Sequence, residues 1–309
     1  MPLDPLVKAF LDQMAMVPGP KMFEMSAPEG RALFVQMMQM IGPKDMPIGG
    51  VKNLDAGGVR LRMYTPVAGG AEPLPVLVYF HGGGFVIGDL ETHDGLCRQF
   101  ANEGGFCVVA VDYRLSPEHP FPAAVDDAFA ALKWIETHAS ELGLDANRIA
   151  VGGDSAGGAL AAVVTQLAKA KGPRIAFQML LFPVTQIGQD TASLREFGAG
   201  YFLDKETLDW FFGHYVPKGQ DKSDLRISPL NATDLKGLPP AYVMLGGFDP
   251  LHDEGLAYAG KLRDAGVKVQ VADYAGLVHC FIYMQAVLPQ AHEAVVAAAK
   301  AVASGLGAK

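Results

Sequence analysis

The sequence predicts an α/β fold with a mostly parallel central sheet, helices on both faces and a helical cap. From about residue 50, short apolar runs typical of strands alternate with helix-forming runs, a pattern that indicates a parallel sheet covered by helices. Residues 1–45 and 185–232 break this alternation, and we expect them to form the cap. A chain of 309 residues can bury a large core, so 1–309 is expected to be a single domain including its cap.

Two helices are expected in the first segment. Asp4 before Pro5 is typical of a helix N-cap followed by proline in the first turn. Ser26 and Glu29 have the spacing of a capping box, which predicts a second helix ending near Gly42. The expected apolar faces are Leu6, Phe10 and Met14 in the first helix, and Leu33, Met37 and Ile41 in the second.

The elements of the sheet layer follow in chain order. Strands are expected at 59–64, 74–80, 106–112, 148–152, 177–182, 241–246 and 267–274, and helices at 92–103, 123–140, 157–171 and 289–304. The insertion at 185–232 follows the fifth of these strands. Its large apolar side chains are Phe202, Leu203, Leu208, Trp210, Phe211, Phe212 and Tyr215.

The segment Gly153–Gly157 has the pattern Gly-x-Ser-x-Gly between a predicted strand and a predicted helix. This is the context of a nucleophile elbow, in which a sharp turn exposes a serine hydroxyl at the top of a sheet. The glycines relieve backbone crowding, and the helix N-terminus after Ser155 offers unpaired N–H groups. A plain glycine turn is the alternative. The spacing fits neither a dinucleotide fingerprint nor a phosphate loop with Lys-Ser/Thr.

A second glycine-rich loop, His81–Gly84, follows the apolar run 75–80. Hydrolases with this type of elbow build the rest of an oxyanion hole at such a strand end. Backbone N–H groups of Gly83, Gly84 and Ala156 are therefore the expected oxyanion donors.

Four histidines follow Ser155 and are candidates for a general base. His292 falls in an alanine-rich helix and is expected at the surface, and His214 lies in an aromatic cluster suited to core packing. His252 comes just after Asp249, near a helix start. His279 follows the strand expected at 267–274, and a loop at a strand's carboxyl end is where a base belongs, so we favour His279.

Asp249 is the favoured acid because it ends the strand expected at 241–246. Its position before Pro250 is equally typical of a helix N-cap, and the two roles are compatible. Asp253 and Glu254 are the alternatives. Both are expected in the first helical turn, where carboxylates are favoured by the helix dipole.

Together these motifs resemble the bacterial hormone-sensitive lipase family of α/β-hydrolase esterases. The resemblance rests on His81–Gly84, 112–119, Gly153–Gly157, 249–251 and His279, and it runs from about residue 50 to the C-terminus. It implies a triad of Ser155, Asp249 and His279, with Gly83, Gly84 and Ala156 as the oxyanion hole. The family usually has His-Gly-Phe at the base, whereas this chain has Cys280 after the histidine.

The resemblance implies a serine carboxylesterase that hydrolyses short- to medium-chain acyl esters through an acyl-enzyme, without metal or cofactor. A catalytically silent receptor of the same fold, an amidase and a lipase are the alternatives. Nine of the 13 methionines lie among the first 46 residues. They suit core packing or an adaptable lid, since methionine fits irregular apolar shapes. The expected substrate-binding residues are Phe85, Phe202, Leu208, Trp210 and Phe212.

Composition limits the partners. A net charge of −8 argues against nucleic acid and anionic membranes. Three cysteines without zinc-site spacing fit a reducing compartment. The N-terminus lacks the pattern of a signal peptide, and no apolar run reaches membrane-spanning length. We therefore expect a cytoplasmic protein acting on a small-molecule ester. The family resemblance suggests a homodimer.

Overall fold

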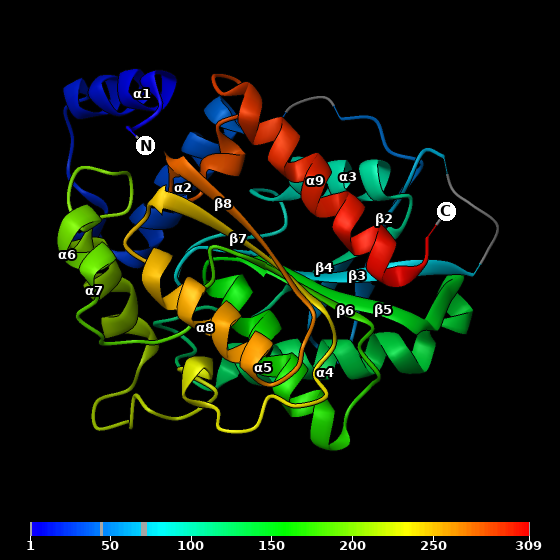
Figure 1. The fold of residues 1–309 in the computed structure, drawn as a ribbon. Coiled ribbons are helices and arrows are strands. Elements are labelled where there is room, and N and C mark those ends of the chain that lie inside the picture. Colours follow the sequence, from blue (N-terminus) through cyan, green and yellow to red (C-terminus); the bar gives the residue numbers. More distant parts are fainter. Residues whose placement is uncertain (1, 44–45, 69–72, 309) are drawn as a thin grey trace.

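A twisted sheet with helices on both faces forms the body of the protein (Figure 1). The computed structural model describes residues 2–43, 46–68 and 73–308, so Met1 and residues 44–45 of the expected cap lie outside the described residues. Within the described part, eight strands form one sheet in the order β1-β2-β4-β3-β5-β6-β7-β8. Their bounds are β1 (Gly50–Asp55), β2 (Arg60–Thr65), β3 (Leu74–Phe80), β4 (Cys107–Asp112), β5 (Leu144–Asp154), β6 (Phe177–Leu181), β7 (Ala241–Phe248) and β8 (Val269–Val278).

The strands from β4 to β8 in this order are parallel, and β1 and β2 add an antiparallel edge. The helices are α1 (Pro5–Met16), α2 (Ala27–Ile41), α3 (Asp94–Gly104), α4 (Ala123–His138), α5 (Ala156–Lys171), α6 (Ala192–Phe197), α7 (Lys205–Tyr215), α8 (His252–Asp264) and α9 (Pro289–Leu306). Helices α3 and α9 cover one face of the sheet and α4, α5 and α8 the other. This is the α/β architecture that the alternation of runs predicts.

Side chains of the central strands alternate between the two faces. In β3, Val76, Val78 and Phe80 enter the core under α4 and α5, and Leu77 and Tyr79 enter the core under α3 and α9. Every residue of β3 is buried, as expected for a parallel strand covered on both sides. The carboxyl ends of these strands therefore converge on one rim of the sheet, and α1, α2, α6 and α7 lie at that end (Figure 1).

Two expected helix faces are only partly correct. In α1 the buried side chain is Val7, whereas Leu6 and Met14 are exposed and Phe10 is half-buried. In α2, Ile41 is buried as expected, but Phe34 and Met38 are buried in place of Leu33, and Met37 is half-buried. Both helices are apolar on more than one side, so tertiary contacts rather than periodicity select the buried face.

Three further elements differ from expectation. The sequence does not predict strand β1, because Gly-Val-Lys-Asn-Leu-Asp lacks a clear apolar run. In the structure this strand lies at the edge of the sheet and is mostly exposed. Strand β5 begins at Leu144, four residues before the expected start. Helix α8 begins at His252 with Leu251 as its N-cap, so Asp249 is not the capping residue. Its Oδ1 instead accepts the Leu251 N–H at 2.8 Å in the turn before the helix.

Candidate active site

Ser155 lies at the sharp turn between β5 and α5. Its backbone has φ 53° and ψ −116°, a conformation that side chains rarely adopt. The turn passes so close to the end of β3 that a Cβ at Gly157 would lie 1.9 Å from the Phe80 carbonyl oxygen. A Cβ at Gly153 would lie 2.4 Å from the same oxygen. Both glycines are thus required by close backbone approach, and the turn has the geometry of an elbow.

The structure brings Ser155, His279 and Asp249 together in a chain of hydrogen bonds. The Nε2 atom of His279 lies 3.1 Å from the Ser155 Oγ, and its Nδ1 lies 2.7 Å from the Asp249 Oδ2. His279 follows β8 and Asp249 follows β7, so both come from carboxyl ends of parallel strands. All three are at least 93% buried. A buried imidazole between a hydroxyl and a carboxylate is the arrangement that general-base activation of serine requires.

The alternative acids, Asp253 and Glu254, hydrogen-bond to other groups than His279. Asp253 accepts the Ser193 N–H at 2.9 Å. The Glu254 Oε1 accepts the N–H groups of Thr185 and Gln186 at 2.7 and 3.2 Å. Burial raises the pKa of Glu254 to about 8 against these two hydrogen bonds.

The alternative histidines also lie apart from Ser155. His292 is exposed on α9, as expected, and its Nδ1 lies 2.6 Å from the Gln99 amide nitrogen. His214 is half-buried on α7 and meets Trp210 edge-on. His252 lies 3.2 Å from an oxygen of Asp273.

The glycines of the loop after β3 adopt backbone conformations that suit an oxyanion loop. Gly83 and Gly84 have φ values of 114° and 61°, which favour glycine. A Cβ at Gly83 would lie 2.3 Å from the Ile87 carbonyl oxygen, and a Cβ at Gly84 would lie 2.1 Å from the Phe211 ring. The N–H groups of both glycines donate to no other residue in the part of the chain that the structure describes. Ala156 is the first residue of α5, where a helix leaves its N–H groups unpaired.

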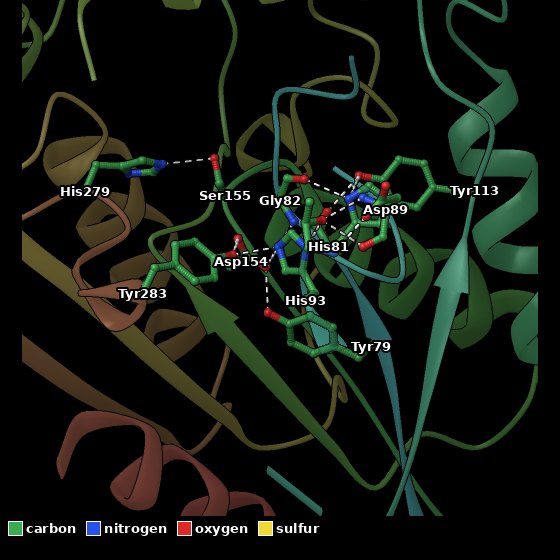
Figure 2. A network of polar contacts seen from close by, with 11 residues as sticks. Tyr79, His81, Gly82, Asp89, His93, Tyr113, Asp154, Ser155, His279 and Tyr283 are labelled. Carbon is green, nitrogen blue, oxygen red and sulfur yellow. Dashed lines mark hydrogen bonds and ion pairs between the residues drawn. The ribbon is translucent and has the colours of Figure 1, made fainter. Parts of the chain in front are cut away.

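Asp154, which precedes Ser155, is the centre of a buried polar network (Figure 2). Its Oδ1 accepts the Tyr79 hydroxyl at 2.6 Å and the Gly82 N–H at 3.0 Å. Its Oδ2 accepts the Tyr283 hydroxyl at 2.5 Å. The Nε2 atom of His93 lies 2.7 Å from the Tyr283 hydroxyl oxygen and 3.6 Å from Asp154 Oδ1. Burial opposes ionisation, but His93 and the two tyrosines outweigh it and hold the pKa of Asp154 below its ordinary value.

His81 lies between this network and the glycine loop. Its ring stacks on Tyr113 with centroids 4.3 Å apart, and its Nδ1 lies 2.7 Å from the Gly82 carbonyl oxygen. Burial, with His93 nearby, lowers the pKa of His81 to about 4. The imidazole is therefore neutral at pH 7 and supports the loop by packing and hydrogen bonding.

The five expected substrate-binding residues separate into three places. Phe85 is buried and stacks on Tyr215 with ring centroids 3.7 Å apart. Leu208 and Phe212 line a cavity of about 540 Å³ that also contacts Pro250 and Leu251, the two residues after Asp249. The other two meet the N-terminal helices. The rings of Phe202 and of Phe10 in α1 have centroids 6.3 Å apart. The Trp210 ring lies so close to α2 that a Cβ at Gly30 would be 3.4 Å from it. Their role in binding stays a prediction.

Cys280 occupies the position after His279 in a left-handed conformation, with φ 57°. This conformation accounts for the glycine usual at this position, because glycine adopts it without strain. The cysteine side chain is half-buried, and burial raises the pKa of its thiol.

The sequence places Phe211 in the aromatic insertion but indicates no role for it in the site. It likewise gives no indication that Tyr79, His93 and Tyr283 meet around Asp154. Tyr283 lies 129 positions from Asp154 in sequence, so no local pattern joins them. In the described ranges, no group of three or more His, Cys, Asp or Glu residues is placed to hold a metal ion. No helix there is both long and apolar enough to cross a bilayer.

Comparison with known proteins agrees with this geometry. A sequence model described as alpha/beta hydrolase fold matches residues 77–283. The carboxylic ester hydrolase LipN of Mycobacterium tuberculosis is 49% identical over 234 residues, which are 74% of this chain and 62% of LipN. An ethyl acetate hydrolase of Pseudomonas putida is 38% identical over 290 residues, covering 89% of both chains.

Solved structures resemble the whole chain. An ester hydrolase from the metagenome of Lake Arreo, Spain, superposes with a TM-score of 0.95 at 43% identity over 99% of both chains. A hyperthermophilic esterase from the archaeon Pyrobaculum calidifontis gives a TM-score of 0.92 at 39% identity, covering 98% of this chain and 99% of that one. The protein therefore belongs to the α/β-hydrolase fold family, in its hormone-sensitive-lipase-like branch of esterases.

Proposed function

We propose that this protein is a serine carboxylesterase in which Ser155 is the nucleophile, His279 the general base and Asp249 the acid that orients the base. The observation that carries the proposal is the continuous set of hydrogen bonds from Ser155 through His279 to Asp249, 3.1 and 2.7 Å long. The esterases named among its relatives support the choice of an ester as substrate.

The proposed reaction has two halves. His279 takes the Ser155 proton as the Oγ attacks the ester carbonyl, and the N–H groups of Gly83, Gly84 and Ala156 stabilise the oxyanion. His279 then gives that proton to the leaving alcohol, which leaves an acyl group on Ser155. Water, deprotonated by the same imidazole, attacks the acyl-enzyme and releases the carboxylic acid. Asp249 holds His279 in the required tautomer and stabilises the imidazolium.

We propose that 1–45 and 185–232 form a cap over this site. The contacts of α7 with the glycine loop and of α2 with Trp210 support this assignment. A cytoplasmic location and a homodimer stay predictions from the sequence.

The test is a substrate panel with purified protein. We expect p-nitrophenyl acetate, butyrate and octanoate to be hydrolysed, an anilide of the same acyl groups to be turned over far more slowly, and emulsified long-chain triglyceride to be a poor substrate. Hydrolysis of none of these would indicate the silent receptor. A preference for the anilide would indicate an amidase, and a preference for triglyceride a lipase.

A further inference from the structure

The proposed reaction requires three segments to keep fixed positions relative to one another: the turn of the nucleophile, the oxyanion loop and the loop of the base. The buried carboxylate of Asp154 belongs to the first and contacts the other two. The turn of the nucleophile starts from Asp154 itself, the last residue of β5, directly before Ser155. The oxyanion loop reaches Asp154 through the Gly82 N–H. The loop of the base reaches it through Tyr283, four residues after His279.

The Asp154 carboxylate is tightly packed and fully buried. A Cβ at Gly82 would lie 2.1 Å from Asp154 Oδ2, so the glycine loop rests directly on the carboxylate. The network around it is equally enclosed. Each of its four side chains is at least 99% buried: Asp154, Tyr79, Tyr283 and His93. None of these groups touches the proposed reacting atoms, so any effect on chemistry must act through the loops they hold.

We propose that Asp154 is a positioning residue that fixes the oxyanion loop and the His279 loop relative to Ser155. The inference rests on the proposed esterase function and adds a specific dependence of turnover on hydrogen bonds behind the site. Oxyanion donors must lie within a few tenths of an ångström of their target to stabilise the transition state. Loosening Gly82 is therefore expected to reduce kcat rather than to weaken ground-state binding.

The principal test is Tyr283→Phe, which removes one hydroxyl and preserves the ring. We expect kcat for p-nitrophenyl butyrate to fall about tenfold, the worth of one buried charge-assisted hydrogen bond. KM should change less than twofold. Tyr79→Phe should behave alike because its hydroxyl contacts the same carboxylate.

Tyr258→Phe is the matched control. Tyr258 is fully buried on α8, and its hydroxyl accepts a hydrogen bond from the Gln166 amide at 3.0 Å, away from Ser155. A purely structural role predicts that all three variants lower the melting temperature with the same small change in kcat. The positioning role predicts a kcat loss in Tyr283→Phe and Tyr79→Phe that Tyr258→Phe does not share.

Asp154→Asn provides the stronger perturbation. An amide cannot accept from Gly82, Tyr79 and Tyr283 through two oxygens, so we expect a kcat loss of about 100-fold if the variant folds. If it does not fold, the tyrosine variants still decide the question. Wild-type kcat in both Tyr283→Phe and Tyr79→Phe, in an enzyme that hydrolyses esters, would overturn this inference alone. A wild-type protein without ester hydrolysis would overturn the proposed function and the inference with it.

Discussion

Ser155 has a strained backbone that its neighbours maintain. Its N–H donates to the Leu181 carbonyl at 2.8 Å, and its carbonyl accepts the Val184 N–H at 3.1 Å. A positive φ in a residue with a side chain costs about 1–3 kcal/mol and persists only where the surroundings fix it. Here both partners lie at or just beyond the end of β6, so the sheet itself holds the elbow.

Ser155→Ala tests the nucleophile. Alanine retains the Cβ and the backbone hydrogen bonds, so the fold should be kept, while ester turnover should fall by a factor on the order of 10⁴–10⁶. Initial rates with p-nitrophenyl butyrate and a thermal melt measure the two effects. Ser304→Ala, at an exposed serine of α9, is the control. Wild-type turnover in Ser155→Ala would contradict the assignment.

The backbone at Cys280 allows strain to be measured directly. Cys280→Ala removes the thiol but keeps a Cβ at φ 57°, and Cys280→Gly removes both. We expect the glycine variant to be more stable than the alanine variant by about 1 kcal/mol, because glycine adopts a left-handed conformation without penalty. Urea unfolding of both proteins gives the difference. An alanine variant as stable as the glycine variant would mean that this turn is unstrained.

At the scale of elements, the strongest predictions came from strands buried on both sides. Strand β3 is apolar at nearly every position, and the glycine loop that follows it is visible in sequence. The face of α1 was not predictable, because Leu6, Val7 and Phe10 offer more than one apolar stripe and packing selects Val7. Strand β1 carries the weak pattern of an exposed edge.

The candidate site also has a part that the sequence predicts and a part that it does not. Ser155, His279 and Asp249 each follow a recognisable strand, so the strand ends indicated that these three side chains would lie together, as they do. The network behind them was not predictable. Tyr79, His93 and Tyr283 are separated by long stretches of chain, and only the fold brings their polar atoms to one carboxylate.

The start of α8 should contribute a pH dependence of stability through Glu254. Its pKa rises from 4.5 to about 8 in the folded protein, so between these values the folded state binds more protons than the unfolded state. Stability from this group is therefore full below about pH 4.5 and is lost as pH rises toward 8, by up to about 1.4 kcal/mol per pH unit.

Glu254→Gln should remove this dependence. A glutamine Oε1 can accept from both Thr185 and Gln186, as the Glu254 Oε1 does. We expect the variant to gain about 2.5 kcal/mol of unfolding free energy relative to wild type between pH 5.5 and 7.5, measured by urea unfolding at several pH values. Glu103→Gln, at an exposed position of α3, should show a constant difference. A constant difference for Glu254→Gln as well would mean that this carboxyl is ionised in the folded protein.

At the scale of the molecule, Arg31 fastens the N-terminal helices to the body. From α2 it donates to the carbonyls of Val86 and Ser116 at 2.8 and 2.9 Å. It also pairs through two nitrogens with Glu118, at 2.9 and 2.6 Å. The hydrogen bond from Arg31 lowers the pKa of Glu118 to about 2. The proposed cap is thus anchored to two loops, one of them continuous with the glycine loop.

The proposed cap should set acyl-chain preference. Each buried methylene contributes up to about 0.8 kcal/mol until the pocket ends, so kcat/KM should rise from acetyl, reach a maximum at about C4–C8 and fall for long acyl chains. Deletion of 1–43 or the milder Arg31→Ala should flatten this profile. Arg148→Ala, which removes a pair with Asp145 at the opposite end of β5, is the control. A maximum at C16, or an unchanged profile in both cap variants, would contradict the cap assignment.

The contact between Gly84 and Phe211 has a consequence for rebuilding this protein from parts. The phenylalanine ring occupies the space where any side chain at position 84 would have to begin, so the loop and α7 have shapes that complement each other. Grafting 185–232 from a relative would place a different surface against the bare backbone of that loop. A chimaera should therefore exchange 82–88 together with the insertion. The two segments must match in shape, although about a hundred residues of chain separate them.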